Sequence, residues 1–240
     1  MQGALEAALS KVADRPVRVA AAGRTDAGVH ATAQVVSFSP PVERPVNAWL
    51  RGTNALTPHS VKVHWVQPVD DTFHARYSAV ARRYQYLFCE AEAPSPLLHG
   101  RATLAGALDD AAMHRAAQAL VGEHDFSSFR AAGCQSLSAF RCVHRISVHR
   151  LESFVVLDIT ANAFLLHMVR NVAGSLVRVG ERAQPEHWIA DLLERRDRGL
   201  AGRTAPPQGL YLVDVSYPGY RFPAGRPPPL LRARGGLDRF

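Results

Sequence analysis

The sequence predicts an α+β protein with a largely antiparallel, mixed central sheet flanked by helices. Segments with hydrophobic residues at helical spacing occur along the chain together with segments of alternating or aromatic residues. These segments follow one another without the strict strand–helix–strand rhythm that a parallel sheet requires. The 240 residues, 47% of them hydrophobic and 20% charged, suffice for a real core and exclude disordered, collagenous and coiled-coil classes.

The first part of the chain predicts helices and strands in alternation. A helix is expected over residues 3–13, because Leu5, Leu9 and Val12 lie at helical spacing before Pro16. The elements expected after it are a strand over 15–19 that runs on to 23, a strand over 34–38, a helix over 46–56 and a strand over 61–66, where hydrophobic and polar residues alternate.

The second part predicts longer strands. In a strand over 81–89, Tyr84, Tyr86 and Phe88 share one face, because side chains alternate across a strand. The elements expected after it are a helix over 109–121, strands over 142–149 and 154–161, helices over 164–179 and 185–195, and a strand over 210–216. A boundary near 72–78 predicts an N-terminal α+β domain (1–75), a C-terminal α+β domain (76–217) and an irregular Pro/Arg-rich tail (218–240).

The net charge of +7 is a weak indication of a nucleic-acid partner. Nearly all of the 28 basic residues are Arg, which suggests a compositional bias, and more than half of the excess lies in the tail. A local stretch is more informative, because residues 127–150 contain four Arg and two His and no carboxylate.

Several classes of protein are excluded by what the sequence lacks. No hydrophobic run approaches the roughly 20 residues that cross a bilayer, and residues 1–10 do not have the pattern of a secretory signal. Three Cys without C-x-x-C spacing argue against a disulfide framework and a structural zinc site. We therefore expect a cytoplasmic enzyme or binding protein without a membrane partner.

Asp26 is the candidate catalytic residue. It lies in a loop between two strand-like runs, with Gly23 and Gly28 on either side and Arg24 close by. An Asp between glycines is most often a turn residue that hydrogen-bonds its own backbone. The surrounding string Ala-Gly-Arg-Thr-Asp-Ala-Gly-Val-His-Ala over 22–31, however, resembles the signature loop of the TruA family of tRNA pseudouridine synthases, in which the Asp is essential.

Four further blocks resemble the same family in the same order. They are FHARYSA with ARRYQY over 73–86, GEHDFSSF over 122–129, NAFLLHMVRN over 162–171 followed by Gly174, and APPQGLYL over 205–212. The resemblance implies the two-domain pseudouridine synthase fold and the isomerisation of uridine to pseudouridine at tRNA positions 38, 39 or 40, in the anticodon stem-loop. This reaction detaches uracil from ribose C1′ and rejoins it through C5. It needs a carboxylate and no metal or redox cofactor.

The resemblance also implies site residues. Asp26 acts as nucleophile or as the base that removes a ribose proton, and the sequence leaves both roles open. Arg170 would keep that carboxylate ionised and oriented, Tyr84 would stack on or hydrogen-bond the target uracil, Leu210 would form an apolar wall, and Arg24 would help to extrude the base. By residue type alone these would be a helix-surface Arg, a sheet-packing Tyr, a core Leu and a loop Arg. Candidates for contact with the RNA backbone are Arg76, Arg82, Arg83, Arg141 and Arg145.

The resemblance leaves three further expectations. Family members begin with a Tyr-Asp-Gly strand before the first helix, so we expect that strand to be lacking and a sheet edge to be unpaired. A homodimer that binds tRNA in a basic cleft is expected. The alternative functions are a tRNA-binding, catalytically weakened member and, with little support, a small-molecule hydrolase that uses Asp26 and His30.

Overall fold

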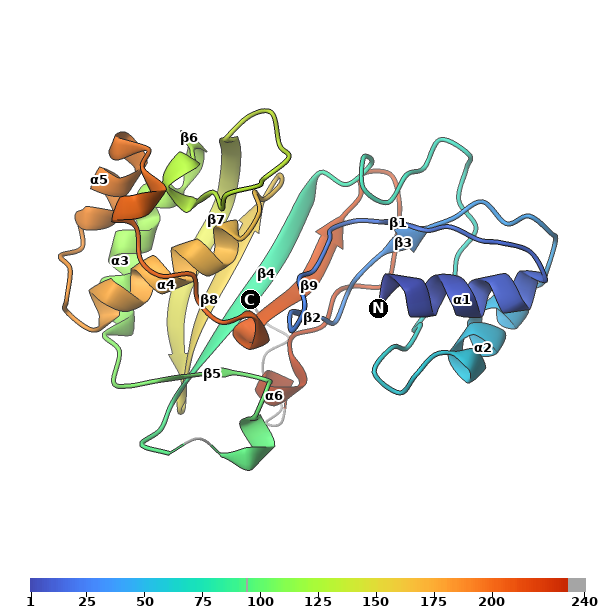
Figure 1. Cartoon of the computed structure of the whole chain (residues 1–240), viewed down its shortest axis with the longest axis horizontal. Coiled ribbons are helices and arrows are strands. Elements are labelled where there is room, and N and C mark those ends of the chain that lie inside the picture. Colours follow the sequence, from blue (N-terminus) through green and yellow to red (C-terminus); the bar gives the residue numbers. More distant parts are fainter. Residues whose placement is uncertain (94, 233–240) are drawn as a thin grey trace. The chain divides into compact units, whose positions relative to one another are not determined.

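The computed structural model describes residues 1–93 and 95–232 (Figure 1). The chain divides into two compact units made of non-contiguous segments. The first comprises 1–24, 34–79 and 217–223, and the second contains 25–33, 80–216 and the described residues after 223. The Asp26 loop thus belongs to the second unit, whereas the sequence placed it in the N-terminal domain. The part of the expected tail over 233–240 lies outside the described residues.

The first unit packs two helices against a short antiparallel pair of strands. Helices α1 (Gln2–Ala13) and α2 (Val46–Leu56) confirm the expected helices, whereas β1 (Ala20–Ala21) and β3 (Val36–Ser37) are much shorter than the expected strands. Buried residues from both kinds of element form its core: Leu9, Ala13, Val17, Val19 and Trp49.

The strand expected over 61–66 is wrong. The alternation is present, because Val61, Val63 and Trp65 are partly buried while the residues between them are exposed, but no strand forms there. The side chain of Asn54 takes the place of a partner strand: its Nδ2 donates to the carbonyl of Val63 at 2.7 Å and its Oδ1 accepts from the amide of Val63 at 2.8 Å. Alternating burial therefore reflects packing here, not a sheet ladder.

The second unit is built on a seven-stranded sheet with the order β2-β9-β4-β8-β7-β6, in which β5 also pairs with β4. The pairs β2–β9 and β4–β5 are parallel and the others antiparallel, which confirms the predicted mixed, largely antiparallel sheet. Its strands are β2 (His30–Ala31), β4 (Ala81–Glu90), β5 (Thr103–Ala105), β6 (Gly122–Asp125), β7 (Phe140–Leu151), β8 (Phe154–Ala161) and β9 (Leu210–Ser216).

The longer predicted elements of this unit are confirmed, with shifted ends. Its helices are α3 (Asp110–Ala117), α4 (Met168–Gly180), α5 (Trp188–Arg195) and the short α6 (Pro229–Arg232). Helix α4 begins four residues later than the hydrophobic pattern suggests, because His167 has a left-handed backbone with φ 59°. The short strands β2, β5 and β6 were not predicted, since two to four residues carry too little periodicity to be recognised.

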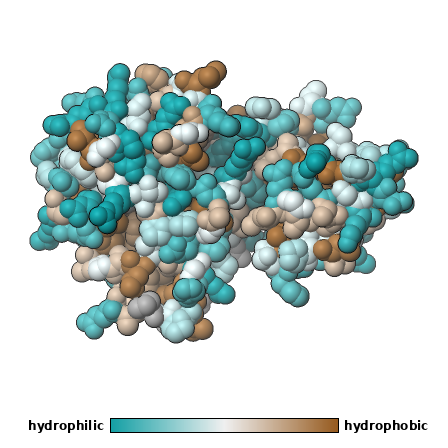
Figure 2. Space-filling model, in the orientation of Figure 1, coloured by the Kyte–Doolittle hydropathy of each residue, from teal (hydrophilic) through white to brown (hydrophobic). Residues whose placement is uncertain are grey.

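The two faces of the sheet are covered by different elements. Helices α3 and α4 pack on one face, and α5 packs against α3 (Figure 1). Tyr84 and Tyr86 of β4 lie on the face opposite to Leu87, because side chains alternate across a strand. The opposite face carries a second cluster with Leu87, Val156 and Tyr211, covered by Leu98 and by Leu231 of α6. On the face seen in Figure 2, hydrophobic side chains appear as separate spots among hydrophilic ones. The sheet is therefore covered on both faces, with buried hydrophobic residues between the layers.

Candidate active site

The loop that carries Asp26 is tied to the edge of the main sheet. Its strand β2 pairs in parallel with β9, and the amide of Thr32 donates to the carbonyl of Leu212 at 2.9 Å. Gly28 has a positive φ of 83°, and a Cβ there would stand 3.0 Å from Cγ of Pro207. Both the backbone conformation and the close approach require glycine at this position. The loop is thereby held against the start of β9.

Asp26 is both a turn residue and a site residue. Its backbone carbonyl accepts from the amide of Val29 at 3.1 Å, which closes a turn over 26–29. Its side chain, 35% exposed, meets two residues of the helix α4 region at the same oxygen. Nη1 of Arg170 donates to Oδ2 at 3.1 Å, and Nε2 of His167 also lies 3.1 Å from Oδ2. Oδ1 has no hydrogen-bond partner among the described residues, so only Oδ2 is held by these two side chains.

Arg170 is fixed from the other side by the segment before β9. Nε of Arg170 donates to the carbonyl of Ala205 at 2.8 Å, and the amide of Ala205 donates back to the Arg170 carbonyl at 3.1 Å. The side chain is only 13% exposed. A guanidinium can serve Ala205 and Asp26 at once because its donors point in fixed, different directions.

Close backbone packing brings Ala205 to Arg170. A Cβ on Gly174 would lie 1.8 Å from the carbonyl oxygen of Arg203, and one on Gly202 would lie 2.6 Å from that of Gly174. The segment around 202–205 therefore crosses α4 directly against the helix backbone, which only glycine permits.

A buried polar network secures the same crossing. Nδ2 of Asn171 donates to the carbonyl of Phe129 at 2.8 Å, and its Oδ1 accepts from Thr204 at 2.7 Å and from Arg198 at 3.0 Å. Oγ of Ser175 accepts from the amide of Gly202 at 3.0 Å. Because Asn171 and Ser175 are fully buried and hydrogen-bonded, the position of α4 beneath this segment is well defined.

Tyr84 lies on the helix-covered face of β4. It is buried and meets the ring of Phe164 edge to face, with 5.1 Å between ring centroids. Burial raises the pKa of the Tyr84 phenol to about 12, with the negative charge of Asp26 acting in the same direction and Arg82 in the opposite one. At neutral pH the hydroxyl is therefore protonated and can donate a hydrogen bond.

Leu210 begins β9 on the same face as Tyr84. It is buried and pairs with Tyr86, while Tyr84 pairs with Leu212. The hydroxyl of Tyr86 donates to the carbonyl of Pro206 at 2.7 Å, which anchors the turn that leads into β9. The structure thus brings Asp26, Arg170, Tyr84 and Leu210 into the same unit and onto neighbouring elements.

Other candidates lie elsewhere. Arg24 and Arg76 belong to the first unit and have exposed side chains, and the guanidinium of Arg76 lies 5.6 Å from the ring centre of Tyr77. Arg82 donates to the carbonyl of Asn162 at 2.9 Å. Arg83 lies on the opposite face of the sheet from Tyr84 and binds the carboxylate of the buried Asp158, with Nε 2.9 Å from its Oδ1. Arg83 is thus occupied within the fold.

The two arginines of the basic stretch also differ in setting. Arg141 holds the preceding loop, because its guanidinium donates to Oγ of Ser136 at 2.6 Å and to the carbonyl of Ser138 at 3.1 Å. Burial lowers the pKa of Arg141. Arg145 is exposed on β7. Arg145 is therefore more available to a partner than Arg83 or Arg141.

His30, which the hydrolase hypothesis paired with Asp26, contacts other residues instead. Its ring stacks on Tyr211 with 4.7 Å between centroids, and its Nε2 lies 2.8 Å from the carbonyl oxygen of Gly100. His30 thus anchors the loop on the far face of the sheet.

His167 is the residue at this site that sequence reasoning missed. It stands inside the quoted block over 162–171, three residues before Arg170, a spacing that places two side chains on one side of a helix. That spacing was the available signal. In the structure His167 lies just before α4, and its side chain still reaches Oδ2 of Asp26 beside that of Arg170.

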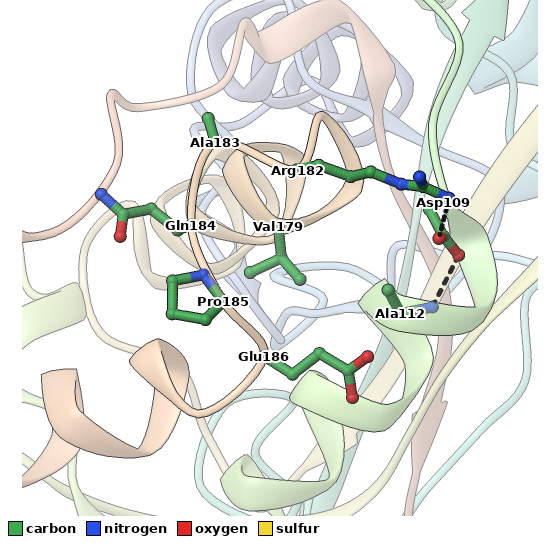
Figure 3. Close-up of a pocket in the computed structure, with 8 residues that line it drawn as sticks. All are labelled: Asp109, Ala112, Val179, Arg182, Ala183, Gln184, Pro185 and Glu186. Atoms are coloured by element: carbon green, nitrogen blue, oxygen red, sulfur yellow. Dashed lines mark hydrogen bonds and ion pairs between the residues drawn. The ribbon is translucent and has the colours of Figure 1, made fainter.

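A cavity of about 490 Å³ lies away from Asp26, where α3 meets the end of α4 (Figure 3). Its charged groups are already paired: Arg182 lies 3.3 Å from Asp109, Asp109 caps α3 through the amide of Ala112, and Glu186 binds Arg115. It contains none of the predicted site residues. The lining residues are Asp109, Ala112, Val179, Arg182, Ala183, Gln184, Pro185 and Glu186.

Metal sites and membrane-spanning helices are absent from the part of the chain that the structure describes. Over residues 1–93 and 95–232, no group of three or more His, Cys, Asp or Glu side chains is placed to hold a metal ion. In the same ranges, no helix is long and hydrophobic enough to cross a membrane.

Comparison with known proteins identifies the family of the chain. A family model described as tRNA pseudouridine synthase matches residues 1–78 and 116–218. The tRNA pseudouridine synthase A of Shewanella denitrificans is 53% identical over 219 residues, which cover 91% of this chain and 84% of that protein. The proteins of the same name from Shewanella frigidimarina and Shewanella baltica are 52% and 54% identical over the same share of each chain. The class that fold, site and matches define is the pseudouridine synthases, which are isomerases. The chain belongs to the TruA family of tRNA pseudouridine synthases.

Proposed function

We propose that this enzyme converts uridine to pseudouridine at positions 38, 39 or 40 of tRNA, in the anticodon stem-loop, with Asp26 as the catalytic residue. The observation that carries the proposal is the carboxylate of Asp26, held through Oδ2 by Arg170 in the same unit as the buried Tyr84. The N1–C1′ bond of the nucleotide breaks, a C5–C1′ bond forms, and the hydrogen on C5 is lost while N1 gains one from solvent. The reaction is a net isomerisation.

The ion pair suits either role of Asp26. As nucleophile, Oδ1 would attack C1′; as base, it would remove a ribose proton; both require the ionised carboxylate. Arg170 favours that form by its charge and, since it holds Oδ2, leaves Oδ1 for the reaction. Because Ala205 restrains the same guanidinium, the carboxylate is oriented before substrate binds.

Tyr84, Leu210 and Arg24 have the remaining proposed roles towards the substrate. Tyr84 would present its ring and its protonated hydroxyl to the detached uracil, and Leu210 would provide an apolar wall. Arg24, which precedes the Asp26 loop and is exposed, would help to take the base out of its stack, because a planar guanidinium can occupy a vacated base position.

The remaining proposals concern the partners. Arginines with exposed side chains, above all Arg145 and Arg76, would contact the RNA backbone, and a homodimer would form the basic cleft. The two-domain pseudouridine synthase fold is part of the same proposal. Since the substrate is tRNA, the enzyme would act in the cytoplasm.

The test is turnover of an unmodified tRNA. Pseudouridine is mapped by carbodiimide labelling after incubation with the unaltered chain and with Asp26→Ala. We expect label at positions 38–40 with the unaltered chain and none with the variant. Labelling that Asp26→Ala leaves unchanged would remove Asp26 from catalysis. tRNA binding by the unaltered chain without any label would favour the tRNA-binding, catalytically weakened alternative.

A further inference from the structure

We propose that His167 is a positioning residue for this reaction: it contacts Oδ2 of Asp26 together with Arg170 and thereby presents Oδ1 to the ribose. The inference rests on the proposed function and adds a residue to its site. Nε2 of His167 and Nη1 of Arg170 each lie 3.1 Å from this one oxygen. Two nitrogen groups converge on Oδ2, and Oδ1 lacks a hydrogen-bond partner among the described residues.

A second contact on the same oxygen has a mechanical consequence. With Arg170 alone, the carboxylate could turn about its last torsion and exchange its two oxygens, because that torsion is broad and roughly two-fold. A second nitrogen on Oδ2 from a different direction opposes this rotation. The reacting oxygen then spends more time in the geometry of attack, which acts on the rate of the chemical step more than on RNA binding.

The backbone of His167 holds its ring in place. The residue adopts the left-handed conformation, with φ 59° and ψ 8°, which is costly for a residue with a Cβ. Its neighbours Leu165 and Met168 are buried, and the amide of Met168 donates to the carbonyl of Leu165 at 3.1 Å. The carbonyl of His167 accepts from the amide of Asn171 at 2.9 Å, which begins α4. The strained residue is therefore pinned on both sides.

The side chain of His167 does not serve the helix. The position precedes α4 as its N-cap, yet the imidazole makes no capping hydrogen bond. It is 32% exposed, so it is not a core residue either. The short contact of the ring with Oδ2 of Asp26 remains as the use of this side chain. A left-handed conformation kept by a non-glycine residue at such a place is typical of functional sites.

Substitutions can distinguish the contribution of the imidazole ring of His167 from that of its left-handed backbone. His167→Gly removes the ring and relieves the left-handed backbone, so the variant is expected to fold at least as well as the unaltered chain. His167→Gln keeps an N–H group near the position of Nε2. Asp14→Gly is the matched control, because Asp14 has a similar left-handed backbone, with φ 53°, at the end of α1 in the first unit.

The measurements are the melting temperature, and kcat and KM for unmodified tRNA from release of tritium on uridine C5. For His167→Gly we expect a melting temperature unchanged or higher, kcat lower by about ten- to a hundredfold, and KM within about twofold. His167→Gln should recover a large part of kcat, and Asp14→Gly should keep kcat unchanged.

Three outcomes overturn the assignment. They are a kcat of His167→Gly within about twofold of the unaltered chain, a loss in KM alone, and a His167→Gln variant no better than His167→Gly. Each requires that the unaltered chain turns over tRNA. If the unaltered chain releases no tritium from any tRNA, the proposed function fails and the role of His167 fails with it, so the two failures are distinguishable.

Discussion

Arg170 and Ala205 exchange two hydrogen bonds: Nε of the arginine donates to the alanine carbonyl at 2.8 Å, and the alanine amide donates to the arginine carbonyl at 3.1 Å. One guanidinium therefore joins the segment before β9 to α4 and also reaches Oδ2 of Asp26. The site depends on this junction, because the segment that fixes Arg170 leads directly to Leu210.

Arg170→Lys should lower activity although the charge is kept. An ammonium cannot donate to Ala205 and Asp26 along the two fixed directions of a guanidinium. We expect kcat/KM to fall by about a hundredfold, the scale for losing an oriented donor at a reacting carboxylate. Steady-state tritium release measures it, with Arg178→Lys on the same helix as control, since Arg178 is half-exposed and pairs with Glu181. A Lys variant as active as the unaltered chain would contradict the fork geometry.

Gly174→Ala should destabilise the second unit. The new Cβ would lie 1.8 Å from the carbonyl oxygen of Arg203, a backbone atom that cannot move aside cheaply. We expect a loss of about 3 kcal/mol or more in the free energy of unfolding, together with reduced turnover as Ala205 is displaced from Arg170. Denaturant unfolding measures the loss. Gly106→Ala is the control, because a Cβ there meets nothing within 4 Å.

Tyr84 should make the stability sensitive to alkali. Burial raises the pKa of its phenol to about 12, so this contribution is complete below the ordinary value of 10 and is lost as the pH rises from 10 towards 12. The free energy of unfolding should fall by about 1.4 kcal/mol per pH unit for this group. Tyr84→Phe should show a shallower fall, measured by denaturant titration at pH 9 to 12. Tyr211, whose pKa burial also raises to about 12, remains in both proteins as a shared background. If the free energies of unfolding of the unaltered chain and of Tyr84→Phe fall in parallel, the pKa of Tyr84 does not differ between the folded and unfolded states.

Arg145 and Arg83 should respond differently to substitution. Arg145 is exposed, whereas Arg83 is engaged with the buried Asp158. Arg145→Gln should reduce the slope of log affinity for tRNA against log salt concentration by about 0.7 to 0.9, the value for one phosphate contact. Arg83→Gln should lower the melting temperature, because it leaves the Asp158 carboxylate with less compensation, and leave the slope unchanged. A slope that changes with Arg83 instead would show that Arg83 contacts a phosphate, since both arginines pair with Thr160 and lie on one face of the sheet.

Much of this protein follows from local pattern. The helices 2–13 and 46–56 and the strands β4, β8 and β9 each extend over seven or more residues, so sequence alone located them. The motif around Asp26 and the block with Arg170 likewise identified the two partners of the ion pair before any geometry was known. The helices and strands follow from neighbouring residues, whereas the pairing of Asp26 with Arg170 followed from the resemblance to the family.

Other features depended on residues distant in the sequence. Residues 61–66 alternate like a strand, but Asn54 satisfies the backbone of Val63 and no ladder forms. The Asp26 loop lies in the early part of the sequence, yet it pairs with β9, about 180 residues later, and so belongs to the second unit. Arg83 and Arg145 look alike in sequence, but Arg83 binds the carboxylate of Asp158 whereas Arg145 is exposed.

The sequence by itself determined the family, the α+β class and the pair of Asp26 and Arg170. The tertiary structure decided which oxygen of Asp26 is held, which arginines are already occupied, and that His167 stands beside the carboxylate. The physical reason is that a turn, a helix or a motif is specified by adjacent residues, whereas orientation at a site depends on contacts between segments more than a hundred residues apart.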